Sequence, residues 1–246
     1  TLRITGGEPL MSNDVWKLFA KCKEEGHKFE VGLNSNLGAK PALIDKLIEA
    51  SWGMHNLTLF TSNESTAEHA EYIRWGLDYD YWCNNMERVF EESNIRRIVV
   101  MMTINALCLF SITDFLDKMI EWKNRYRHKS IGISINFLRF PACQSLVVLP
   151  KHIRERIAQD IEMWYHTNKD DNMLNAMEKG DIERLINYVR VVEQGHDFHD
   201  HDKSANVRDF KRFYSQYDIR RNRTIEVFPQ YFLEWYNKIE LTNVKN

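Results

Sequence analysis

The residues best suited to chemistry form a short loop near the start of the chain, Thr5-Gly6-Gly7-Glu8-Pro9. Paired glycines let the backbone adopt positive φ and let a ligand approach it closely. Glu8 adds a carboxylate beside them, and a carboxylate suits a positively charged ammonium group. The loop therefore predicts a ligand site. An ordinary strand-to-helix turn is the alternative explanation for so short a motif.

Polar residues also follow two later segments that have the pattern of strands. Asn34-Ser35-Asn36 ends a strand expected over residues 28–34, and Ser62 follows a strand expected over residues 55–60. Ligand sites of α/β proteins gather beyond the carboxyl ends of parallel strands. We therefore expect Thr5–Glu8, Asn34–Asn36 and Ser62 to converge with the strand ends near Thr103 and Leu138.

The elements that must position these residues alternate between strand and helix. Alternating or continuous apolar stretches predict five strands, over residues 1–5, 28–34, 55–60, 97–104 and 131–138. Each is followed by a stretch with helical periodicity, of which residues 112–126 are the clearest example. This alternation predicts an α/β fold with a parallel sheet and right-handed connections.

The glycine-acid loop resembles the GGEP motif of radical S-adenosylmethionine (radical SAM) enzymes. The resemblance implies that Thr5, Gly6, Gly7 and Glu8 receive the amino group of the cofactor's methionine moiety. It also implies that Asn34 and Ser35, at the end of the next strand, lie near the cofactor.

Two further residues are similar to family positions that lie near the methionine carboxylate. Ser62 matches a serine at the end of the fourth family strand, and Arg74 ends a Tyr-Ile-Arg segment found in many members. A guanidinium group binds a carboxylate as a fork. The alternatives are that Ser62 caps the following helix and that Arg74 lies on a solvated face.

The resemblance implies a partial (β/α)6, TIM-like barrel over residues 1–148, with a helical extension over residues 149–246 packed on it. The chain begins at Thr1, within an expected strand, so we interpret it as a fragment that lacks the first strand of the barrel. The helix after Leu149-Pro150 and the tail over residues 210–229 resemble the C-terminal end of phage and bacterial radical SAM proteins with a twitch-type domain.

Cysteine spacing departs from the family pattern. Radical SAM enzymes hold a [4Fe–4S] cluster with three cysteines in a C-x-x-x-C-x-x-C loop, and thiolates are the usual ligands of such clusters. Cys22, Cys83, Cys108 and Cys143 do not have this spacing. The ligands are expected upstream of Thr1, so we predict no metal ligands here and an inactive chain when it is expressed alone. Cys83 and Cys143 could be auxiliary ligands, although isolated cysteines are more often simply buried.

By resemblance, the full-length protein is a radical SAM enzyme supplied by an external electron donor. It would cleave S-adenosylmethionine to methionine and a 5′-deoxyadenosyl radical, which abstracts hydrogen from a substrate. The family-level expectation for that substrate is a peptide, and no catalytic residue can be named. The competing hypothesis is a non-catalytic α/β binding module that has lost its cluster.

The composition limits the classes of partner that we expect for this protein. The net charge of −2 over 246 residues gives no electrostatic case for nucleic acid or a membrane surface, and scattered cysteines favour a reducing, cytoplasmic location. The segment His196–Asp202 could bind a metal, although a solvated loop is the favoured interpretation. The basic and aromatic tail over residues 210–229 could hold single-stranded nucleic acid, although an aromatic helix face fits its periodicity better.

Overall fold

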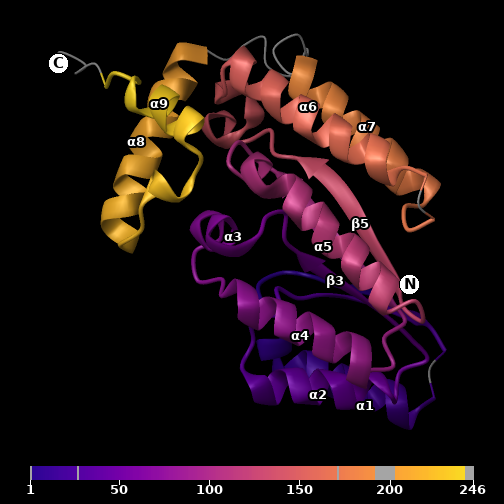
Figure 1. Ribbon diagram of the computed structural model, residues 1–246. Helices are drawn as coiled ribbons and strands as arrows, with labels where there is room; N and C mark the ends of the chain where they lie inside the picture. The colour runs from indigo at the N-terminus through magenta and orange to yellow at the C-terminus, as the bar shows by residue number, and fades with distance from the viewer. Residues whose placement is uncertain (1, 27, 171, 192–202, 242–246) are drawn as a thin grey trace. The chain divides into compact units, whose positions relative to one another are not determined.

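The computed structural model describes residues 2–26, 28–170, 172–191 and 203–241. Within these residues the chain has an α/β fold (Figure 1). It contains one five-stranded sheet, in the order β1-β2-β3-β4-β5. The strands are β1 (Leu2–Ile4), β2 (Glu30–Asn34), β3 (Asn56–Ser62), β4 (Arg97–Ile104) and β5 (Ser130–Phe137). All five predicted strands are confirmed.

The sheet is parallel. Leu33 on β2 pairs with Ile4 on β1 and with Leu59 on β3, and β3 pairs in the same sense with β4. At the other edge, Ser130 N donates to Arg96 O at 2.7 Å and Leu138 N donates to Ile104 O at 2.9 Å. Residue numbers rise together along both strands of this last pair, which is the parallel sense.

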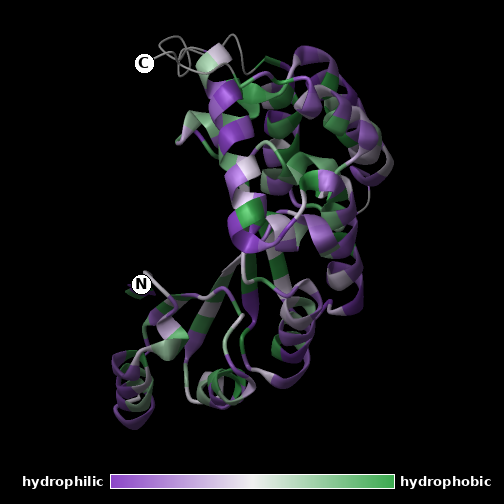
Figure 2. Cartoon of the chain, turned by 90° about the vertical axis from the view of Figure 1, so that its left-hand side faces the viewer, coloured by the Kyte–Doolittle hydropathy of each residue, from purple (hydrophilic) through white to green (hydrophobic). Residues whose placement is uncertain are grey.

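Nine α-helices follow or separate the strands in the described part of the chain. They are α1 (Asn13–Glu24), α2 (Pro41–Ser51), α3 (Ala67–Ile73), α4 (Tyr79–Glu92), α5 (Ile112–Arg125), α6 (Lys151–Asn168), α7 (Ala176–Val191), α8 (Lys203–Arg221) and α9 (Gln230–Asn237). Pro41 opens α2 at a favoured first position, and Asp78 caps α4 by accepting a bond from Tyr81 N. Polar and apolar residues alternate along the helices (Figure 2), as expected for amphipathic elements.

The chain forms two compact units. Unit 1 comprises Thr1–Asn63, Leu77–Met102 and Asp117–Ser134, and unit 2 comprises Glu64–Gly76, Thr103–Leu116 and Ile135–Asn246. Strands β4 and β5 therefore begin in unit 1 and end in unit 2. The predicted domain boundary between residues 148 and 149 stays a prediction, and unit 2 takes in residues on both sides of it.

The two faces of the sheet in unit 1 differ in burial. Leu57, Leu59 and Thr61 on β3 are buried, and Trp82 of α4 donates its indole N–H to Thr61 Oγ1 at 3.2 Å, so helix α4 covers this face. The alternate residues Thr58, Phe60 and Ser62 are half-buried. Because side chains alternate between faces, this second set defines a more open face of the same strands.

Arg3 shows that the sheet curves toward its open face. Its guanidinium lies 4.4 Å from the ring centre of Phe60, and its Nη2 lies 3.5 Å from Met101 Sδ on β4. The axes of β1 and β4 would be about 14 Å apart in a flat sheet, given the spacing between strands. A contact between these two side chains therefore indicates that the open face is concave.

Unit 2 contains the helices that follow Leu149. Helices α6 and α7 lie side by side (Figure 1). The aromatic residues of α8 and α9 pack together, with Phe210 lying 4.8 Å from Tyr214 and 6.3 Å from Phe232 between ring centres. Phe210 and Tyr214, both on α8, are buried, so the prediction of an aromatic helix face is confirmed for the α8 part of the tail over residues 210–229.

The segment His196–Asp202 lies outside the described residues. The described helices include none that is long and apolar enough to cross a membrane.

Candidate functional site

The loop after β1 exposes its backbone where the two glycines lie. Gly6 has a φ of 92° and Gly7 a φ of 51°, a region that side chains other than glycine rarely adopt. A Cβ atom built on either glycine would meet no atom within 4 Å. The backbone of Gly6 and Gly7 is therefore open to the close approach of a ligand.

The Glu8 carboxylate joins this loop to the loop after β2. Its Oε1 accepts hydrogen bonds from Leu10 N at 3.0 Å and from Ser35 Oγ at 2.8 Å, and its Oε2 accepts one from Asn36 N at 2.9 Å. A carboxylate offers about four acceptor positions. Among the described contacts, one acceptor position on Oε2 is left for a ligand.

Ser35 and Asn36 are held in place by the same network. Ser35 is buried, its Oγ accepts a bond from Leu37 N at 3.1 Å, and its backbone N–H donates to Phe60 O of β3 at 2.9 Å. Asn36 Oδ1 accepts a bond from Gly38 N at 2.8 Å. The loops after β1 and β2 and the end of β3 therefore form one connected rim.

Asn34 and Ser62 lie on the open face just below this rim. Asn34 pairs in register with Phe60, and its Oδ1 accepts a bond from Arg3 Nε at 3.3 Å. Ser62 pairs in register with Met101 and is half-buried. Helix α3 has Thr66 at its N-cap position, so the alternative that Ser62 caps that helix is wrong.

The structure thus brings together, within unit 1, the predicted residues Thr5–Glu8, Asn34–Asn36 and Ser62. They lie at the carboxyl ends of three neighbouring parallel strands. Glu8 and Ser62 therefore lie at the same end of the sheet, where the carboxyl ends of the strands are.

Arg74 is paired within unit 2. Its Nε donates to Glu64 Oε1 at 3.1 Å, and its Nη2 donates to Glu64 Oε2. The Glu64 side chain is buried and that of Arg74 is 30% exposed, so the alternative of a solvated arginine is wrong. A role for Arg74 toward a cofactor carboxylate stays a prediction, and it would require the guanidinium to exchange this partner.

Sequence reasoning missed Glu64 and Arg3. Glu64 follows Ser62 and Asn63 directly, so an acid within a polar strand end was the available signal. Arg3 occupies the open-face position of β1, opposite Gly32 of β2. Its position was not predictable, because a strand of three residues does not by itself show which of its faces is open.

The cysteines do not form a metal site. The described residues contain no group of three His, Cys, Asp or Glu side chains that could hold a metal ion. Burial raises the pKa of Cys83 to about 11 and the pKa of Cys108 well above its ordinary value. Burial also raises the pKa of Cys22 and of Cys143. Iron–sulfur ligands are thiolates, and burial opposes thiolate formation at each of these cysteines.

A scan against protein-family models and searches of curated proteins and of solved structures found no match to this chain.

Proposed function

We propose that the rim formed by the loops after β1 and β2 and the end of β3 binds S-adenosylmethionine, in a protein of the radical SAM type. The observation that carries the proposal is the geometry of Glu8. Its carboxylate fixes the rim through three hydrogen bonds and keeps one acceptor position beside the open backbone of Gly6 and Gly7.

The cofactor's ammonium group would be received at this position. A charged ammonium donor and a carboxylate acceptor form a charge-assisted hydrogen bond, which is about twice as strong as a neutral one. Backbone carbonyl groups of Thr5–Gly7 would supply further acceptors. Asn34 and Ser62 would line the adjoining open face with an amide and a hydroxyl group.

We further propose that the sheet belongs to a partial (β/α)6 barrel. Three observations support this proposal. The strands lie in the sheet in the order in which they occur in the chain, they are parallel, and α4 covers one face of the sheet. The contact of Arg3 with Met101 indicates that the sheet curves toward its open face, opposite α4. In a barrel, the face toward which the sheet curves is the interior.

A [4Fe–4S] cluster does not fit the described residues, because they offer neither the grouped ligands nor ready thiolates. In this proposal the cluster ligands come from sequence outside these residues. The described residues therefore account for cofactor binding and not for cofactor cleavage. A cytoplasmic location and an external electron donor remain expectations attached to the enzyme.

The competing function is a non-catalytic binding module of the same fold. The lack of a grouped ligand set among the described residues is the observation that favours it. Cofactor binding at the rim is common to both functions, so it is the property to test first.

Calorimetry of S-adenosylmethionine binding tests the proposal. Glu8→Gln keeps the shape of the side chain and removes its charge, so the affinity should fall about tenfold to a hundredfold. Affinity for 5′-methylthioadenosine, which lacks the ammonium group, should change little. Glu24→Gln, at the exposed end of α1, is the matched control and should bind like the wild type. No binding by the wild type, or equal binding by Glu8→Gln, would contradict the proposal.

A further inference from the structure

The open face of the sheet in unit 1 carries a cation that the proposed cofactor site does not use. Arg3 projects from β1 onto the same face as Asn34 and Phe60. Its side chain is exposed. Side chains of β2, β3 and β4 contact the Arg3 side chain on this face.

Neutral groups hold the Arg3 guanidinium in place. Its Nε donates to Asn34 Oδ1 at 3.3 Å, its Nη2 contacts Met101 Sδ at 3.5 Å, and the Phe60 ring lies 4.4 Å away. Stacking of arginine on an aromatic face is favourable and fixes the plane of the fork. Arg3 is thus oriented without a carboxylate partner among the described residues.

Gly32 makes room for this arrangement. A Cβ atom at Gly32 would stand 3.1 Å from Phe60 Cε2 and 3.7 Å from Arg3 Cγ. An added Cβ atom on β2 would therefore push the aromatic ring, while its contact with the arginine stem would be an ordinary one. The glycine lets Phe60 lie over β2 and support Arg3.

Two of the guanidinium nitrogens are engaged by these neutral groups, and five N–H donors are present in all. The remaining donors form part of a planar fork, a geometry that matches a carboxylate or a phosphate group. The contacts with Asn34, Met101 and Phe60 supply no negative charge to Arg3, whereas an oxyanion would supply one.

We propose that Arg3 forms an oxyanion-binding subsite on the concave face of the sheet. The group bound is a carboxylate or phosphate, and it has two sources. One is the methionine carboxylate of the cofactor, which rests on the proposed function. The other is an anionic group of a substrate that occupies the same face.

The subsite is tested by nuclear magnetic resonance on the whole chain. The Arg3 Nε–H signal is assigned by its loss in Arg3→Gln and is followed during titration with inorganic phosphate, acetate and S-adenosylmethionine. At least one of them should shift it saturably. The Arg96 signal is the control, because Arg96 is exposed at the amino end of β4, on the same sheet. No saturable shift of Arg3 by any of the three ligands would overturn the proposal.

Calorimetry then separates the two sources. If Arg3 receives the cofactor carboxylate, Arg3→Gln weakens S-adenosylmethionine binding about tenfold to a hundredfold and leaves 5′-methylthioadenosine binding unchanged. If it receives a substrate anion, S-adenosylmethionine binding is unchanged and phosphate or acetate still shifts the Arg3 signal. Should the wild type bind no S-adenosylmethionine, the proposed function fails, while the phosphate and acetate titrations still decide the subsite.

Discussion

The Glu8 carboxylate accepts a hydrogen bond from the hydroxyl group of Ser35, which lies 27 residues further along the chain. This bond makes one side chain serve two purposes. The Glu8 carboxylate fixes the position of two loops, and it keeps one acceptor position on Oε2 for a ligand. A ligand would thus meet a carboxylate whose orientation is already set, which lowers the entropic cost of binding.

Ser35→Ala tests how strongly this bond stabilises the rim. The change removes the hydroxyl that donates to Glu8 and accepts from Leu37 N. Because hydrogen bonds to charged groups contribute about 1.5–3 kcal/mol, the free energy of unfolding should fall by about that amount in urea denaturation. Ser12→Ala is the control, since Ser12 stands at the N-cap of α1 without a side-chain capping bond. A loss for Ser35→Ala no larger than for Ser12→Ala would contradict the account.

Cys83 gives a prediction about pH. Burial is the main cause that raises the pKa of Cys83 from its ordinary 9.0 to about 11. A raised pKa means less thiolate at a given pH, so at pH 8 the thiolate fraction should be about a hundredfold below that of an ordinary cysteine. The rate of alkylation by iodoacetamide, followed by peptide mapping, should still rise with pH above 9, where that of an ordinary cysteine levels off, and should level off only near pH 11. Rapid alkylation of Cys83 at pH 8 would show that its thiol is not desolvated.

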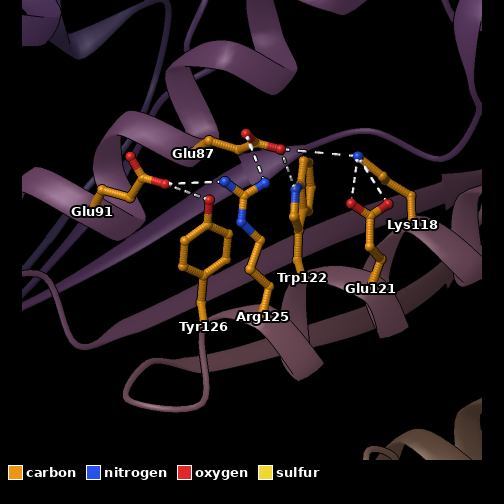
Figure 3. Close-up of polar contacts among 7 residues, drawn as sticks. All are labelled: Glu87, Glu91, Lys118, Glu121, Trp122, Arg125 and Tyr126. Carbon is orange, nitrogen blue, oxygen red and sulfur yellow. Dashed lines mark hydrogen bonds and ion pairs between the residues drawn. The ribbon is translucent and has the colours of Figure 1, made fainter.

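At the scale of elements, α4 and α5 are joined in unit 1 by a network of charged and aromatic side chains (Figure 3). Glu87 of α4 accepts from Trp122 Nε1 at 3.0 Å and from Arg125 Nη1 at 3.5 Å. Tyr126 donates its hydroxyl to Glu91 at 2.8 Å. Trp122 is also fully buried and packs against Phe90, so it combines a polar contact with core packing.

Two substitutions in this network separate packing from charge. Trp122→Ala opens a large cavity between the helices and should lower the free energy of unfolding by about 3–5 kcal/mol. Arg125 is 53% exposed, so Arg125→Ala should cost less than about 1 kcal/mol. Urea denaturation of both variants measures the difference. Similar losses would show that the ion pairs of Arg125 contribute as much as the packing of Trp122.

At the level of the whole molecule, the sequence predicted the strands and their parallel arrangement better than it predicted the contacts of single side chains. The apolar run over residues 97–104 and the spacing of strand and helix were sufficient to predict the parallel sheet. The pairing of Arg74 with Glu64 was not predictable, because both residues match patterns that also occur at ligand sites. The concave face could not be predicted either, because the curvature of a sheet depends on how four strands pack together and not on the sequence pattern of any one strand.

Glu8 and the glycine loop are proposed to receive the ammonium group of S-adenosylmethionine. The most direct measurement is a crystal structure of the chain soaked with this cofactor. The account predicts the methionine nitrogen at hydrogen-bond distance, about 2.7–3.2 Å, from Glu8 Oε2, with the bonds from Ser35 and Asn36 to Glu8 preserved. Cofactor density at another place on the chain, or a bound cofactor whose ammonium group does not reach Glu8, would contradict it.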